Sequence, residues 1–176
     1  MSNIEPIVKI LQKDGKNCGI CSQGYAQLGL AQTKKELIRQ YIRGIDFCFD
    51  NDFPKKEFIK QYFYPECECQ GLYVEAGDVD IENALHTILI GKTYANITYN
   101  NYSVGRVYLK EEAQATISAT DNAKVLSVDC FDSSKVKISC TGNAKVTVYL
   151  YGDSMCDIVA GKERVKIVKK DKNRYV

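Results

Sequence analysis

The chain has 176 residues, with 24 lysines and arginines against 22 aspartates and glutamates, giving a formal net charge of +2. This balance excludes both a polycationic nucleic-acid-binding tail and an acidic disordered chain. A hydrophobic content of 45% is ordinary for one or two small globular domains, and the single histidine, His86, excludes a multi-histidine metal site.

The first third of the sequence carries the patterns of short helices. Apolar residues at helical spacing predict a helix over residues 4–13, and residues 25–31 predict a second, shorter one. Thr33 and Glu36 form a capping-box pattern, which predicts a helix from there to about Phe49. Pro54 then suits the start of a further helix. These elements define a small helical unit over residues 1–66.

The middle of the chain predicts the first strands. Residues 71–75 and 84–90 are rich in apolar and β-branched residues, whereas residues 78–82 read as an acidic connection between them. His86 lies in the second of these strands, where we expect a structural role rather than that of a catalytic base.

The second half of the chain is an internal repeat. Residues 113–125 and 134–146 share seven of thirteen amino acids at an offset of 21. Apolar or small residues alternate strictly with polar ones between turn dipeptides, a period of two that is typical of strands. The alternation changes phase near Ser127, which predicts a β-bulge.

Two architectures fit strands of this length with such short turns. One is an antiparallel meander or sandwich, the other a β-solenoid with two strands in each coil of about 21 residues. The recurrence of small residues in the same inward columns favours the solenoid, because a narrow coil needs small side chains inside. The prediction is therefore an α+β protein, in which the helical unit caps a β-repeat domain over residues 67–176.

Two cysteine pairs are the sharpest local motifs. Cys18 and Cys21 form a C-x-x-C pair, and Cys67 and Cys69 form a C-x-C pair about 46 residues later. Four thiolates are one of the ligand sets of a structural zinc ion, so zinc is the one cofactor that we consider. The alternative is plain thiols on a turn, since no histidine lies nearby and C-x-C is a less usual zinc ligand pair.

Lysines and tyrosines of the repeat predict a binding surface. Lys124 and Lys145 are equivalent at the 21-residue offset, and a group of tyrosines accompanies them in the β region. Exposed clustered tyrosines favour binding over catalysis, whereas lysines on a strand also serve as a solvated face that discourages aggregation. The predicted surface comprises Tyr99, Tyr102, Tyr108, Tyr149, Tyr151, Lys124 and Lys145.

Several segments resemble one group of bacterial proteins. The run from Glu36 to Pro54, residues 71–74, residues 102–108 and the repeated Asn-Ala-Lys-Val are similar to β-repeat proteins of gut Bacteroidales genomes, prophages and mobile elements. The resemblance covers most of residues 33–176 and carries no activity or catalytic residues. It implies an intracellular bacterial or phage context.

These patterns together predict a non-enzymatic structural or interaction protein. We find no nucleophile, nucleotide or dinucleotide motif, and we expect a rigid β-repeat surface that binds a protein partner or a second copy. The alternatives are a zinc-binding regulator that uses the four cysteines and a self-assembling solenoid. We expect neither a nucleic-acid partner nor a membrane span, and we expect a cytoplasmic location, or a phage particle if the protein is phage-encoded.

Overall fold

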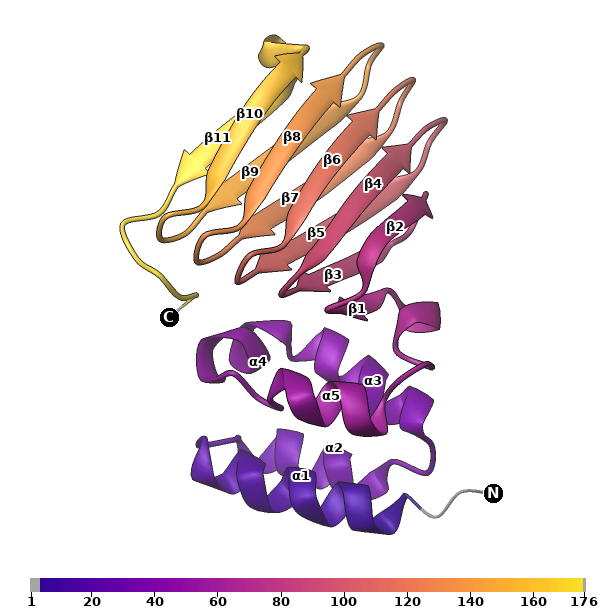
Figure 1. Ribbon diagram of the computed structural model, residues 1–176, viewed down its shortest axis with the longest axis vertical. Helices are drawn as coiled ribbons and strands as arrows, with labels where there is room; N and C mark the ends of the chain where they lie inside the picture. Colours follow the sequence, from indigo (N-terminus) through magenta and orange to yellow (C-terminus); the bar gives the residue numbers. More distant parts are fainter. Residues whose placement is uncertain (1–3, 176) are drawn as a thin grey trace. The chain divides into compact units, whose positions relative to one another are not determined.

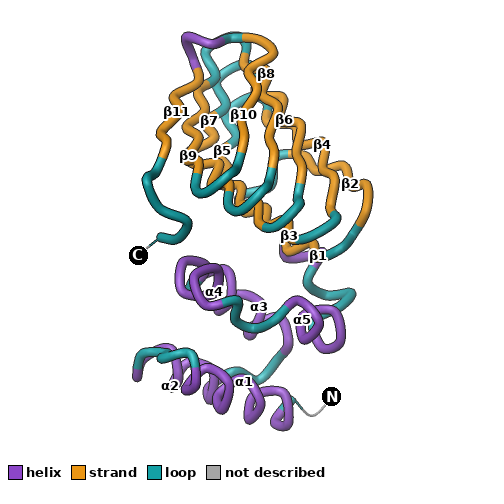
Figure 2. The backbone as a smooth tube through the Cα atoms, turned by 60° about the vertical axis from the view of Figure 1, so that its left-hand side comes forward, coloured by secondary structure: helices purple, strands orange, loops and turns teal. Residues whose placement is uncertain are grey.

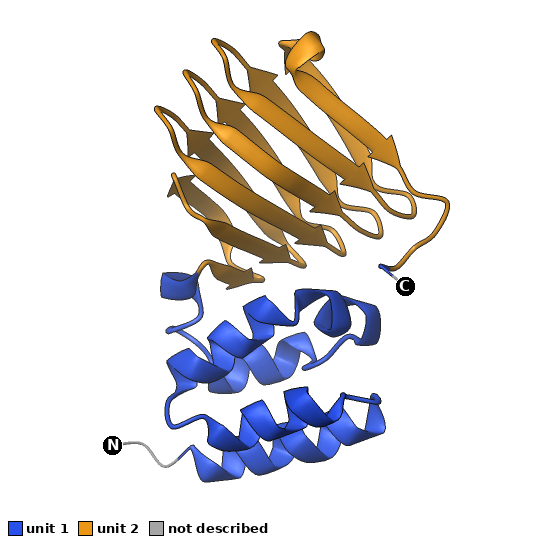
Figure 3. Ribbon diagram, turned by 180° about the vertical axis from the view of Figure 1, so that it is seen from behind, with its two compact units in different colours: residues 1–70, 175–176 blue, residues 71–174 orange. Residues whose placement is uncertain are grey.

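A computed structural model describes residues 4–175 of the chain as two compact units (Figure 3). The first unit comprises the described residues up to Gln70 together with Tyr175, and the second comprises Gly71–Arg174. The first unit is helical and the second consists of strands.

Five short helices build the first unit (Figure 1). They are α1 (Glu5–Asn17), α2 (Ser22–Leu30), α3 (Lys34–Arg43), α4 (Ile45–Asn51) and α5 (Lys56–Tyr62), followed by the 3-10 turn η1 (Glu68–Gln70). The predicted capping box is present, because Thr33 Oγ1 accepts from the Glu36 amide while the Glu36 carboxylate accepts from the Thr33 amide. The expected helix up to Phe49 is instead divided into α3 and α4 at Gly44.

The second unit is a parallel β-solenoid, which confirms the favoured architecture over the antiparallel meander (Figure 2). The odd-numbered strands form one sheet, here called sheet A, in the order β1-β3-β5-β7-β9-β11. The even-numbered strands form sheet B, in the order β10-β8-β6-β4-β2. Every neighbouring pair is parallel, so the chain alternates between the sheets and completes one coil with every two strands.

The strands are five to seven residues long apart from the first. Their bounds are β1 (Leu72–Val74), β2 (Gly77–Glu82), β3 (His86–Ile90), β4 (Thr93–Tyr99), β5 (Val104–Lys110), β6 (Gln114–Ala119), β7 (Lys124–Cys130), β8 (Lys135–Cys140), β9 (Lys145–Leu150), β10 (Met155–Ala160) and β11 (Val165–Lys169), with the 3-10 turn η2 (Lys162–Arg164) before the last.

The register matches the repeat that the sequence predicted. Ala115 pairs with Val136, 21 residues further along the chain, and Lys124 pairs with Lys145 at the same offset. The first coil is shorter, since Ile81 pairs with Ile97 only 16 residues away. A register shift between Gly105 and Arg106 on β5, opposite Ser127 on β7, confirms the predicted bulge.

Residues 78–82 correct one expectation. They belong to β2 rather than to an acidic connection, because Val79 and Ile81 point into the coil while the three acidic side chains point out. The high charge of this segment conceals an alternation of the same kind as in the later strands.

The interior of the solenoid is a stack of small and branched side chains. Ala115, Ile117 and Ala119 of β6 are at most 5% exposed, and Val136, Ile138 and Cys140 of β8 lie directly beside them in register. Side chains of similar size stack from coil to coil, so a chain with no tryptophan still forms one continuous core in the solenoid.

Corner residues link successive coils through their side chains. Asp121 and Asp132 adopt left-handed backbone conformations, as turn residues do. Their carboxylates accept hydrogen bonds from the amides of Asn101 and Glu111, one coil earlier, at 3.0 and 3.1 Å. Asp121 and Asp132 therefore serve as corner residues that tie each coil to the one before it.

Candidate functional site

From β2 to β8 the outer face of sheet B is polar, and its charge changes from acidic to basic. Asp78, Asp80 and Glu82 point outward from β2, and Lys135 and Lys137 point outward from β8. The two strands between them carry mainly neutral side chains, including Asn96, whose Nδ2 donates to Asp80 Oδ1 at 3.0 Å. The face therefore has an acidic side and a basic side two strands apart.

The last coil, formed by β10 and β11, is the least buried part of the solenoid. No residue of either strand is fully buried, whereas every strand from β3 to β9 contains buried residues. Met155 and Val159 are 61% and 67% exposed, and Ile167, which pairs with the fully buried Val148, is 38% exposed. Ile167 continues the inward column of Val148, and this column of the core therefore reaches solvent at the last coil.

The residues after β11 lie against the preceding coil. The Lys170 amide donates to the Leu150 carbonyl at 2.8 Å, and its ammonium lies 5.3 Å from the Tyr149 ring centroid. Gly152 is close to the side chain of Asn173. Within the described residues, β10 pairs only with β8 and β11 only with β9, so each strand leaves one edge of its sheet open. In Figure 1 these two strands form the outermost coil.

The predicted tyrosine surface is wrong for three of its five tyrosines. Tyr99 is fully buried, because its ring points into the coil over Gly105 and its hydroxyl donates to the Ala84 carbonyl at 2.9 Å. Tyr108 and Tyr151 are 7% and 5% exposed, and Tyr151 stacks on Phe131.

The remaining predicted surface residues are accessible. Tyr102 is 81% exposed at a corner, and Tyr149 is half-buried. Lys124 and Lys145 are exposed neighbours on sheet A, as the 21-residue offset predicted. They lie on a different sheet from Lys135 and Lys137, so the four lysines do not form one patch.

The four cysteines proposed as zinc ligands differ in their surroundings. Cys21 is exposed at the start of α2, where its sulfur accepts from the Gly24 amide at 3.3 Å, and Cys69 is exposed in η1. Cys18 is half-buried, and burial raises the pKa of the Cys67 thiol to about 11, which disfavours the thiolate that zinc requires. Among residues 4–175 no three potential metal ligands lie together. Zinc binding stays a prediction.

His86 has the surroundings of a structural residue. It is half-buried on β3, directly beside Arg106 of β5. Burial, and secondarily the nearby guanidinium, lowers the pKa of its imidazole, so the ring is neutral over a wider range of pH.

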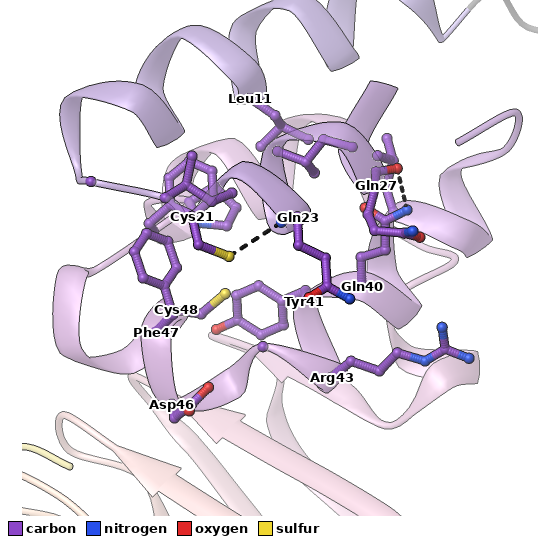
Figure 4. Close-up of a pocket in the computed structure, with 18 of the residues that line it drawn as sticks. Leu11, Cys21, Gln23, Gln27, Gln40, Tyr41, Arg43, Asp46, Phe47 and Cys48 are labelled. Atoms are coloured by element: carbon purple, nitrogen blue, oxygen red, sulfur yellow. Dashed lines mark hydrogen bonds between the residues drawn. The ribbon is translucent and has the colours of Figure 1, made fainter. Parts of the chain in front are cut away.

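The helical unit contains a cavity of about 620 Å³ (Figure 4). Its floor is formed by buried apolar side chains that include Leu11, Leu37 and Phe63. Polar side chains line it as well, and Gln23, Gln40 and Arg43 lie on one side in Figure 4. The volume and the mainly apolar lining are those of a small-molecule pocket.

No family model matches the sequence, and searches among curated proteins and solved structures find no significant match. The resemblance to Bacteroidales β-repeat proteins therefore stays a prediction. None of the helices within the described residues has the length and apolarity needed to cross a membrane.

Sequence reasoning missed three features of these surfaces. The acidic side of sheet B had a signal in the alternation of Val79 and Ile81. The exposure of the last coil also had a signal in the sequence, because Met155 and Val159 are apolar residues at outward positions. The cavity had no signal in the sequence, because its walls come from four separate helices, the turns beside them and Phe63 after α5.

Proposed function

We propose that this protein is a non-enzymatic assembly component, in which the β-solenoid joins a second copy of the chain through its last coil. The observation that carries the proposal is the exposure of β10 and β11, whose outer edges are unpaired within the described residues. Open strand edges with apolar side chains pair with other strands, and solenoids normally cover them with a cap.

The geometry of the coil favours a second copy over another partner. The last coil presents two strand edges at once, one on each sheet, at a separation set by the width of the coil. A partner that pairs with both must offer two strands at the same separation, and another last coil of this chain does so. A twofold axis perpendicular to the coil axis makes the paired strands antiparallel, a closed arrangement that stops at a dimer.

Charge selects between the two possible twofold axes. One axis pairs β11 with β11 of the other copy and so brings Lys166, which pairs with the outward Thr147, near its own counterpart. The other pairs β11 with β10 of the other copy, which places Lys166 on the same outward face as Asp157, an exposed residue of β10. Opposite charges across neighbouring strands stabilise a pair and like charges destabilise it, so we propose the second arrangement.

The proposal is tested by the mass of the protein in solution. Light scattering after size-exclusion chromatography, over a concentration series, should give a dimer that dissociates on dilution. Ile167→Lys should weaken the dimer about tenfold or more, because the dimer buries the exposed part of Ile167 in both copies and the substitution places a charge there in each. Val104→Lys is the matched control, since Val104 is equally exposed at 38% but lies on β5, away from the last coil.

Two results would overturn the proposal. One is a monomer at every concentration, and the other is equal weakening by Val104→Lys and Ile167→Lys. If Ile167→Lys does not fold, as judged by circular dichroism, Val159→Lys serves instead, because Val159 is 67% exposed and its side chain is not part of the core.

A further inference from the structure

Gln40, which lines the cavity of the helical unit, carries a buried acceptor that lacks a partner among the described residues. The Gln40 side chain donates from Nε2 to the Gln27 carbonyl at 2.7 Å. A carbonyl can accept only from the nitrogen, so this bond determines which end of the amide is the oxygen. Gln40 Oε1 is buried and has no hydrogen-bond partner among the described residues. A buried unsatisfied acceptor costs about 1–3 kcal/mol, which a suitable donor recovers.

The lining around this oxygen defines what would bind. The floor is apolar, with Leu11, Leu37 and Phe63 each at most 2% exposed. Arg43 and Asp46 both line the cavity and both are exposed, so they contribute one positive and one negative charge at its solvent side. An ionised ligand would lose its hydration over an apolar floor without net charge compensation from this pair.

We infer that this cavity is a binding site for a neutral, mainly apolar small molecule that carries one hydroxyl or amide N–H donor. The apolar part of the ligand covers the floor, and the donor bonds Gln40 Oε1. The bond to the Gln27 carbonyl fixes the position of the Gln40 amide, which lowers the entropy lost on binding. Because Oε1 is covered in the ligand-free structure, neighbouring side chains must move aside before a donor can reach it. This site belongs to the helical unit and does not depend on the association of the solenoid.

A matched pair of probes tests the donor directly. The probes are 4-propylphenol, which has a hydroxyl donor, and 4-propylanisole, in which a methyl group replaces that hydrogen. Their affinities for the full chain are measured by titration while the side-chain amide signals of the glutamines are followed by NMR. We expect the phenol to bind about tenfold more tightly than the anisole, a difference of about 1.4 kcal/mol, and to shift the Gln40 side-chain signals.

Variants then assign the preference to Gln40. Gln40→Leu should bind both probes with similar affinity, because the apolar floor remains and the acceptor is gone. Gln61→Leu is the control, since Gln61 is an exposed glutamine of α5 that does not line the cavity, and it should keep the tenfold preference. If Gln40→Leu does not fold, the NMR signals of the unaltered chain decide the question, because the phenol and not the anisole should shift the Gln40 side-chain amide.

Three outcomes would overturn the inference. They are the absence of binding by either probe, equal affinity of the two probes for the unaltered chain, and a preference for the phenol that persists in Gln40→Leu. The last of these would place the donor contact elsewhere.

Discussion

Replacing Val136 by aspartate should unfold the solenoid, while the reversal of its neighbour Lys137 to glutamate should be tolerated. Val136 is 2% exposed, and it stands in one inward column with Ala115 and Cys156. The substitution removes about 1.5–3 kcal/mol of apolar burial and places an unpaired carboxylate in the core, which costs several kcal/mol more. The sum is comparable to the whole stability of a typical domain, about 5–15 kcal/mol.

Lys137 points to solvent from the same strand. It pairs in register with Thr116 on one side and Asp157 on the other, so Lys137→Glu replaces a favourable cross-strand pair by two like charges. Such an exposed exchange costs about 0.2–1 kcal/mol. Urea unfolding followed by circular dichroism in the β-sheet band measures both variants. Equal destabilisation by the two substitutions would refute the inward–outward register of β8.

Three further predictions follow from particular residues. Gly77 and Gly161 have positive φ values of 70° and 74°, but an added Cβ meets nothing at Gly77 and meets the Cys140 carbonyl at Gly161. Gly77→Ala should therefore cost about 1–2 kcal/mol for backbone strain alone, and Gly161→Ala clearly more; thermal unfolding that ranks them the other way would refute the packing at this corner. The free energy of unfolding should fall from about pH 9 towards pH 11, because burial raises the pKa of Cys67 and of Cys156 to about 11 and the thiols of the unfolded chain ionise first. This fall should be shallower in Cys67→Ala. An unchanged slope in that variant would contradict the burial of Cys67. A colorimetric thiol reagent should modify the exposed Cys21 and Cys69 of the native protein rapidly, and the fully buried Cys130 and Cys140 only after denaturation. Mass mapping that finds Cys130 or Cys140 among the first residues to be modified would contradict their burial in the core.

The repeat was predictable because its signal is physical and local. Strict alternation with small inward residues such as Ala115 and Val136 restricts the strands to a narrow interior, and the 21-residue offset gives the coil length directly. The capping box of Thr33 and Glu36 was predictable for a similar reason, since both partners lie within one helical turn.

Other features depend on contacts that no local pattern contains. The sequence predicts Tyr99 to be one of several exposed tyrosines. Its side chain instead points into the coil, because Gly105 leaves room for its ring. β2 reads as a connection because its outward acidic residues dominate its composition, although Ile81 belongs to the core. The cavity beside Gln40 is formed by side chains from separate helices, so only the folded structure reveals it.

The stacking of helices on the first coil stays a prediction of the sequence. The two units meet in the sequence between Gln70 and Gly71. The proposed assembly depends on the solenoid alone, whose last coil leaves the outer edges of β10 and β11 open within the described residues.

The measurement that tests this claim most directly is amide hydrogen exchange of the full chain at two protein concentrations, above and below the midpoint of association. Association through the last coil predicts that amides of β10 and β11 exchange more slowly at the higher concentration, while those of β4 and β6, which are already paired on both sides, exchange at unchanged rates. Exchange in β10 and β11 that does not depend on concentration would contradict this mode of association, and protection confined to other strands would place the interface elsewhere.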